Sequence, residues 1–357
     1  MRVGVFLAAA LLLVMFAGCS DARTGAPSDT GTEDHAASAQ SVVRAGSSEK
    51  TLATPNDFPA AYDYGSGVNA YGNYALMERR LPLPQTDATV LHTEPDTNAI
   101  QVLYLWEEGN APAQTVYTEN TRGYYDDPDF RPYMTAIPVP AGTTPKGAVV
   151  LLAGGAFQAR GNYTDTLPTA AHLRALGYQT FIVDYRLRPY TQQEGALDVA
   201  RAVRYIRAHA DAYGIDPEDI AVMGYSAGGI QAGEFLLHYD EDVSPTTLDP
   251  NYTPDALDEV PAHASAAGMI YSFYGRLSVA SRDLDDLRAG ALPPTFYCYG
   301  TEDPFFDQFD MQFDLMQEVG VPVRRIVLED WPHGFGGDGG WVGDYAEWLE
   351  EIFAAND

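Results

Sequence analysis

The second half of the chain alternates between short apolar runs and stretches whose apolar residues recur at helical spacing. Residues 147–152 read GAVVLL, the composition of a strand that is buried on both faces. In residues 196–212 the apolar side chains fall every three or four positions, which predicts a helix that Gly214 ends. This alternation predicts an α/β fold, with a mostly parallel sheet that helices cover on both faces. Further strands are expected at residues 180–184, 220–223, 266–273, 295–299 and 323–328, and further helices at 310–319 and 345–353.

The part of the chain that precedes this pattern is less regular. Apolar runs at residues 100–106 and 133–139 predict two strands, whereas prolines and glycines interrupt the rest of residues 51–140. We therefore expect residues 51–140 to form an N-terminal extension that packs on a main domain over residues 141–357.

The N-terminus has the pattern of an export signal. A basic start is followed by an apolar run from Val3 to Ala17, which is shorter than the roughly 20 residues of a membrane span. The run ends in Phe-Ala-Gly before Cys19, and small residues before a cysteine resemble the bacterial lipobox. That resemblance implies that residues 1–18 are a signal peptide and that a lipid on Cys19 anchors an exported lipoprotein on the extracytoplasmic side of the membrane. An ordinary cleaved signal is the alternative.

Residues 19–50 contain almost no large apolar side chain and are rich in Ser, Thr, Ala, Gly and Asp. Such a composition cannot bury enough surface to fold. We expect a flexible tether between the lipid and the folded domain.

Charge and cysteine content exclude several classes of partner and site. The formal net charge is −29, from 50 acidic and 21 basic residues, so the chain lacks the excess of basic residues that a nucleic-acid partner requires. Two cysteines, Cys19 and Cys298, cannot form a disulfide framework, and no His/Cys cluster has the spacing of a zinc site. We expect no structural metal, and we expect Cys298 to be buried inside its strand.

A candidate nucleophile lies between the strand at 220–223 and the helical segment that follows it. Residues 224–229 read GYSAGG, which is a G-x-S-x-G motif in the strand–turn–helix context that the motif requires. The turn at Ser226 must be sharp, and glycines at 224 and 228 remove the Cβ atoms that would collide there. The hydroxyl of Ser226 then projects from the end of the strand, where the helix N-terminus points its amides.

A serine hydroxyl needs a base and a carboxylate to become a nucleophile. His333 lies between a proline and a glycine just beyond the last strand, where it can reach Ser226. Asp303 follows the strand at 295–299, and Glu302 is its nearest competitor for the same role. The chain order Ser226, Asp303, His333 is the order of α/β-hydrolase triads.

The fourth part of such a site is a pair of backbone N–H groups that stabilise a developing oxyanion. Ala227 directly follows the nucleophile and should supply one donor. The loop after the first strong strand reads Ala-Gly-Gly-Ala-Phe, and its small residues let the backbone approach a substrate oxygen. We assign Gly155 and Ala156 as candidates for the second donor.

From about Gly147 to the C-terminus, the chain resembles the esterase/lipase branch of the α/β-hydrolases, which includes hormone-sensitive-lipase-like enzymes and carbohydrate acetyl or feruloyl esterases. The resemblance implies an α/β-hydrolase fold and a serine esterase without a cofactor. In this family the first motif is usually His-Gly-Gly-Gly, and here Ala153 and Ala156 replace the histidine and the third glycine. The family's turn at Asp184-Tyr185-Arg186 is structural, and Asp198 reads as a helix-face salt bridge. The motifs that carry the resemblance are AGGAF at 153–157, VDYRL at 183–187, GIDPEDIAVMGYSAGG at 214–229, YGTEDP at 299–304 and PHGF at 332–335.

These observations predict a serine carboxylic-ester hydrolase that acts through an acyl-enzyme. An acidic surface suits neutral substrates, such as small or oligosaccharide esters that carry acetyl or hydroxycinnamoyl groups. Trp331 and the tyrosines could contact a sugar at the rim. Two alternatives are a serine peptidase of the prolyl-oligopeptidase type and a non-catalytic surface-binding protein on the same fold.

Overall fold

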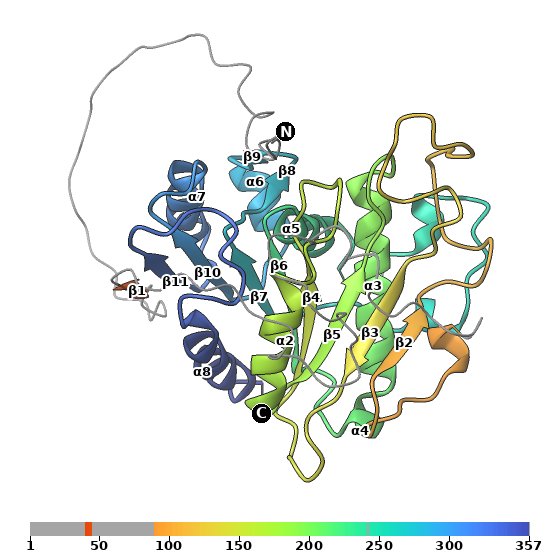
Figure 1. The fold of residues 1–357 in the computed structure, drawn as a ribbon, viewed down its shortest axis with the longest axis horizontal. Helices are drawn as coiled ribbons and strands as arrows, with labels where there is room; N and C mark the ends of the chain where they lie inside the picture. Colours follow the sequence, from red (N-terminus) through yellow and green to blue (C-terminus); the bar gives the residue numbers. More distant parts are fainter. Residues whose placement is uncertain (1–39, 45–88, 241–242, 357) are drawn as a thin grey trace, which may run out of the picture. The chain divides into compact units, whose positions relative to one another are not determined.

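The computed structural model describes residues 40–44, 89–240 and 243–356, and these residues build a nine-stranded sheet. The strands lie in the order β1-β11-β10-β7-β6-β4-β5-β3-β2 (Figure 1). Neighbours from β1 to β5 in this order pair in parallel, whereas β3 and β2 are antiparallel to their neighbours. The strand bounds are β1 Gln40–Arg44, β2 Gln101–Tyr104, β3 Tyr133–Ile137, β4 Ala148–Leu152, β5 Gln179–Asp184, β6 Ile220–Tyr225, β7 Ala266–Ile270, β10 Thr295–Gly300 and β11 Val323–Leu328.

Each strand expected from an apolar run is present. In the interior strand β4 all five residues are buried, because β5 and β6 flank it and helices cover both of its faces. Cys298 is also buried, on β10, as expected. A separate small hairpin, formed by β8 (Gly275–Arg276) and β9 (Val279–Ala280), follows β7.

Helices lie on both faces of the sheet, which confirms the expected layering. On one face α2 (Thr166–Ala175) packs beside α8 (Trp341–Phe353), and on the other α3 (Gln192–Ala208) packs beside α5 (Ala227–His238) (Figure 1). The remaining helices are α4 Ala210–Tyr213, α6 Leu284–Ala289 and α7 Phe306–Glu318, with short 3₁₀ turns at Val90–His92, Pro245–Thr247 and Ala256–Glu259.

Helix α3 begins before the apolar periodicity does. Thr191 and Glu194 form a capping box, which satisfies the first amides and starts the helix at Gln192. The helix is interrupted at His209, and Gly214 ends the short following helix in a left-handed conformation, with φ +68°.

Segments from the N-terminal part of the chain join the sheet. Within residues 19–50, which were expected to be a tether, Gln40–Arg44 pairs in parallel with β11 as an edge strand; the sequence QSVVR contains adjacent valines, which favour a strand. Within residues 51–140, which were expected to form an extension packed on the main domain, β2 and β3 are strands of the same sheet. Residues 1–39 and 45–88, with Cys19 among them, lie outside the described residues.

The register brings the carboxyl ends of several strands to one edge of the sheet. Leu152 pairs with Gly224, and Tyr225 pairs with Ile270, so β4, β6 and β7 end at the same level. Gly300 likewise pairs with Leu328 at the ends of β10 and β11. Loops that are distant in sequence therefore meet at this edge, where an open α/β sheet places its ligand site.

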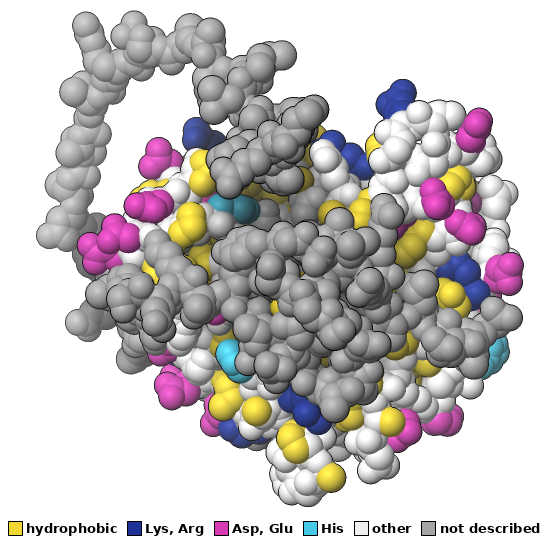
Figure 2. Space-filling view, in the orientation of Figure 1, with side chains coloured by type: hydrophobic (Ala, Val, Ile, Leu, Met, Phe, Trp, Pro, Cys, Tyr) yellow, Lys and Arg dark blue, Asp and Glu magenta, His cyan; other side chains and the backbone are white. Residues whose placement is uncertain are grey.

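On the face of the molecule that Figure 2 shows, the visible acidic side chains are scattered and do not form one patch. None of the helices in the described part of the chain combines the length and the hydropathy needed to cross a membrane.

Candidate active site

Ser226 occupies the sharp turn between β6 and α5. Its backbone has φ +48° and ψ −120°, a conformation that is strained for a residue with a Cβ atom. A Cβ atom at position 224 would lie 2.2 Å from the carbonyl oxygen of Gly228, and one at position 228 would lie 2.2 Å from that of Leu152. Both positions therefore exclude every side chain, as the motif predicted.

The structure brings Ser226, His333 and Asp303 together, each from a loop that follows a strand. His333 Nε2 lies 2.8 Å from Ser226 Oγ, and His333 Nδ1 lies 2.6 Å from Asp303 Oδ2. A proton on Nδ1 directed at the carboxylate leaves Nε2 free to accept the serine proton. This is the arrangement of a nucleophile, a base and an orienting carboxylate.

The carboxylate of Asp303 is fully buried, with a side-chain exposure of 0%, and its second oxygen accepts a hydrogen bond from the amide of Phe305 at 2.9 Å. These two contacts fix the carboxylate on both sides. The competing residue, Glu302, is exposed.

Two aromatic rings hold the imidazole. The ring of Tyr271 lies 4.8 Å from that of His333, and the ring of Phe305 lies 5.7 Å from it, both edge to face. The His333 side chain remains 30% exposed, so the base is accessible from solvent.

The loop after β4 has an unusual backbone at the predicted oxyanion donors. Gly155 has φ +137°, and a Cβ atom there would lie 2.1 Å from the carbonyl oxygen of Ala159. Ala156 and Phe157 follow with φ +56° and +57°. Within the described residues, the amides of Gly155, Ala156 and Ala227 donate to no protein acceptor, so all three remain candidates for oxyanion donors.

The sequence interpretation missed a buried carboxylate beside this loop. Asp165 Oδ2 accepts a hydrogen bond from the amide of Gly154 at 2.9 Å, and Asp165 Oδ1 accepts one from the Tyr271 hydroxyl at 2.8 Å. Burial raises the pKa of Asp165 above its ordinary value. Asp165 belongs to none of the motifs identified in the sequence, and an aspartate before a helix is a common N-cap, so no sequence signal marks it as part of the site.

The other acids that sequence reasoning set aside are structural. Asp198 pairs with Arg186 at 2.9 Å and accepts a hydrogen bond from the Trp106 indole, so the expected ion pair exists but is buried. Asp184 accepts a hydrogen bond from Asn162, and its burial raises its pKa to about 6. These residues fix the loop after β5.

The expected aromatic sugar contact at Trp331 is wrong. Trp331 is only 3% exposed and packs against Phe335, since its backbone lies tightly against Gly300 and turns the indole inward. The tyrosines at 62, 64, 71 and 74 lie outside the described residues.

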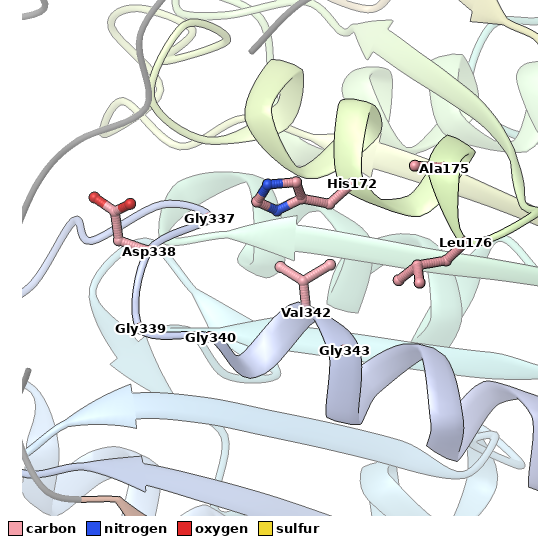
Figure 3. A pocket seen from close by; sticks show the side chains of 9 residues that line it. All are labelled: His172, Ala175, Leu176, Gly337, Asp338, Gly339, Gly340, Val342 and Gly343. Carbon is pink, nitrogen blue, oxygen red and sulfur yellow. The ribbon is translucent and has the colours of Figure 1, made fainter.

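A cavity of about 420 Å³ opens between α2 and the glycine-rich segment before α8. Figure 3 shows His172 of α2 on one side of this cavity and Val342 on the other, and neither belongs to the site at Ser226. The described residues contain no cluster of His, Cys, Asp and Glu that could hold a metal ion.

The chain is similar to known esterases over part of its length. The BD-FAE family model matches residues 137–243. An acetylxylan esterase of Xylanibacter ruminicola is 25% identical over 227 residues, which cover 57% of this chain and 45% of that protein. A probable carboxylic ester hydrolase of Mycobacterium tuberculosis is 31% identical over 134 residues, which cover 37% of this chain and 28% of that protein. The chain thus spans less than half the length of these two relatives.

A solved structure covers more of the chain. The acetyl ester-xyloside bifunctional hydrolase of Caldicellulosiruptor lactoaceticus superimposes with a TM-score of 0.54 at 20% identity, over 73% of this chain and 97% of that one. The chain has the α/β-hydrolase fold. Strand order, the turn at Ser226 and the triad order agree with this assignment, and the α/β-hydrolase sheet accounts for every strand from β2 to β11 except the β8–β9 hairpin.

Proposed function

We propose that this α/β-hydrolase is a serine carboxylic-ester hydrolase. The observation that carries the proposal is the line of two short contacts, 2.8 Å from Ser226 Oγ to His333 Nε2 and 2.6 Å from His333 Nδ1 to Asp303 Oδ2. These contacts lie beside backbone amides that face no acceptor among the described residues. A nucleophile, a base and oxyanion donors within one site are the parts that acyl transfer requires.

In the acylation step, Ser226 Oγ forms a bond to the ester carbonyl carbon while its proton passes to His333 Nε2. The carbonyl oxygen becomes an oxyanion, which Ala227 and either Gly155 or Ala156 stabilise through their N–H groups. The intermediate collapses, the bond to the leaving alcohol breaks, and His333 returns the proton to that alcohol. Asp303 remains ionised and stabilises the imidazolium.

In the deacylation step, water replaces the alcohol. His333 accepts a proton from water, the resulting hydroxyl bonds to the acyl carbon, and a second oxyanion forms in the same place. When it collapses, the acid leaves and the proton returns to Ser226 Oγ. The cycle uses no cofactor.

We propose acetylated or hydroxycinnamoylated oligosaccharides as the substrate class. The match to the BD-FAE model and the likeness to an acetylxylan esterase support carbohydrate esters. The net charge of −29 also favours a neutral substrate over an anionic one.

A panel of substrates tests both levels of this proposal. The chain is incubated with acetylated xylo-oligosaccharides, feruloylated xylo-oligosaccharides, p-nitrophenyl acetate and a dipeptide anilide, with the Ser226→Ala variant as the blank. Release of acetate or ferulate from the oligosaccharides supports the carbohydrate assignment. Turnover of p-nitrophenyl acetate alone would support esterase activity but contradict the carbohydrate substrate class. Turnover of the anilide alone would contradict the proposed esterase activity.

We also propose that the chain is an exported lipoprotein anchored through Cys19. The apolar run before Cys19 and the small residues that precede it support this proposal. Expression in a bacterium with an alkyne-labelled fatty acid should label the protein and retain it in the membrane fraction. The Cys19→Ala variant should lose both, and equal labelling of the variant would contradict the proposal.

A further inference from the structure

Asp165 is a buried carboxylate that the mechanism above does not use. It occupies the N-cap position of α2, but its side chain makes no capping bond to that helix. Its Oδ2 instead accepts a hydrogen bond from the Gly154 amide, and its Oδ1 accepts one from the Tyr271 hydroxyl and a longer one, 3.2 Å, from the Thr164 hydroxyl. A buried carboxylate is costly unless it accepts several hydrogen bonds, and two of these three come from groups at the site.

The first contact acts on the oxyanion loop. Gly154 directly precedes the candidate donors, and a Cβ atom on it would lie 3.0 Å from Ser226 Cβ and 3.1 Å from Asp165 Oδ2. The backbone of Gly154 is therefore enclosed between the nucleophile and the carboxylate. Because Gly154 is joined directly to Gly155, a shift of the Gly154 backbone would also move the N–H groups of Gly155 and Ala156.

The second contact acts on the base. Tyr271 follows β7 with φ +38°, and its ring packs against the imidazole of His333 at 4.8 Å. Its hydroxyl also accepts a hydrogen bond from the amide of Gly336 at 3.3 Å, in the loop that carries His333. Asp165 thus connects, through one tyrosine, to the ring that must receive the serine proton.

We propose that Asp165 is a positioning residue for the reaction, which holds the oxyanion loop through Gly154 and the His333 imidazole through Tyr271. The inference rests on the proposed esterase function. It predicts that loss of the carboxylate lowers kcat more than it changes KM, since the transition state needs both positioned groups and ground-state binding does not.

Four variants separate the two contacts. Asp165→Ala removes both, and Asp165→Asn keeps the shape and one acceptor oxygen but replaces the other by a donor. Tyr271→Phe keeps the ring and removes only the hydroxyl. Asp184→Asn is the matched control, because Asp184 is another buried carboxylate whose partners are Asn162 and, at 3.8 Å, Arg160, rather than Gly154 or Tyr271.

The readouts are kcat and KM on p-nitrophenyl acetate, the rate at which a fluorophosphonate labels Ser226, and the melting temperature. Asp165→Ala should lower kcat by about 10²–10³, the scale of a lost oxyanion donor, with KM changed less than about threefold. Asp165→Asn and Tyr271→Phe should lie between this variant and the parent, with the labelling rate falling in parallel with kcat. Asp184→Asn should keep kcat within about twofold of the parent, since it touches neither contact.

A folded Asp165→Ala variant with the parent's kcat and labelling rate would overturn the proposal and make Asp165 purely structural. If that variant does not fold, Asp165→Asn decides by the same criterion. Because the labelling rate does not depend on any ester, a parent chain that labels but hydrolyses no ester would refute the proposed function while Asp165 remains testable.

Discussion

The turn at Ser226 and the loop at residues 153–157 both place strained backbone at the edge of the sheet, but the strain is distributed differently in each. At the turn, one residue bears the strain, with φ +48°, and the glycines at 224 and 228 make room for it. In the loop, Ala156 and Phe157 both adopt positive φ values of +56° and +57°, although both have side chains.

The two regions also differ in what holds them. At the turn, the glycines two positions before and after Ser226 make room for the strained backbone, and the Ser226 amide donates to Ile270 O at 3.0 Å. The loop is held by backbone hydrogen bonds within residues 154–161, by Asp165 on the Gly154 amide and by the amide of Arg188, which donates to Phe157 O at 3.1 Å. The turn presents a reactive side chain, whereas the loop presents only backbone groups. Substitutions should therefore affect the two regions differently.

Asp303→Asn should lower kcat strongly, because it changes a side chain that contacts the imidazole of His333. The amide cannot hold the imidazole in the tautomer that leaves Nε2 as the acceptor, so kcat should fall by about 10⁴. Glu302→Gln, at an exposed neighbouring position, should leave kcat within about twofold of the parent. A similar loss in both variants, measured on p-nitrophenyl acetate, would contradict the assignment of Asp303.

Gly228→Ala should disrupt the turn itself. The added Cβ would lie 2.2 Å from Leu152 O, so strand β4 or the helix must shift, at a cost of about 2–4 kcal/mol in the free energy of unfolding. Activity should fall by at least about 10², because Ser226 moves with the helix. Gly343→Ala in α8 is the control, as no atom lies within 4 Å of its Cβ; it should stabilise the chain by about 0.5–1 kcal/mol. Urea titrations measure the free energy of unfolding of both variants. Equal values for Gly228→Ala and Gly343→Ala would contradict the predicted clash at position 228.

Asp184→Asn changes a buried carboxylate that belongs neither to the turn at Ser226 nor to the loop at residues 153–157. Because burial raises the pKa of Asp184 to about 6, above its unfolded value, the folded chain binds this proton more tightly and loses stability as pH rises through about 6. The variant lacks this titration. Its free energy of unfolding relative to the parent should therefore improve by about 1–2 kcal/mol between pH 5 and pH 7.5. A difference that stays constant across this range, in denaturation at both pH values, would show that Asp184 titrates normally.

Ala156→Gly, in the loop at residues 153–157, should have the smallest effect on stability and on kcat. Glycine relieves a left-handed cost of about 1 kcal/mol but adds a similar entropy to the unfolded chain, so stability should change by less than about 1 kcal/mol. The N–H group remains, and kcat should stay within about threefold of the parent. A loss of about 10² in kcat would mean that the Ala156 side chain, rather than Asp165, holds the loop.

The distance along the chain between contacting residues explains what could be predicted from the sequence. The strands at 147–152 and 220–223 were predictable because buried parallel strands are wholly apolar, and the turn at Ser226 because its glycines are adjacent in the chain. The antiparallel pairing of β3 with β5 was not predictable, because it depends on which sheet edge is free. Asp165 and the burial of Trp331 also escaped prediction, since each depends on contacts with residues far away in sequence.

The kcat of the Ser226→Ala variant on p-nitrophenyl acetate decides whether Ser226 is the nucleophile. We expect a loss on the order of 10⁶ in a chain that keeps the parent's melting temperature, because the acyl-enzyme can no longer form. A variant that turns over at the parent's rate would contradict it.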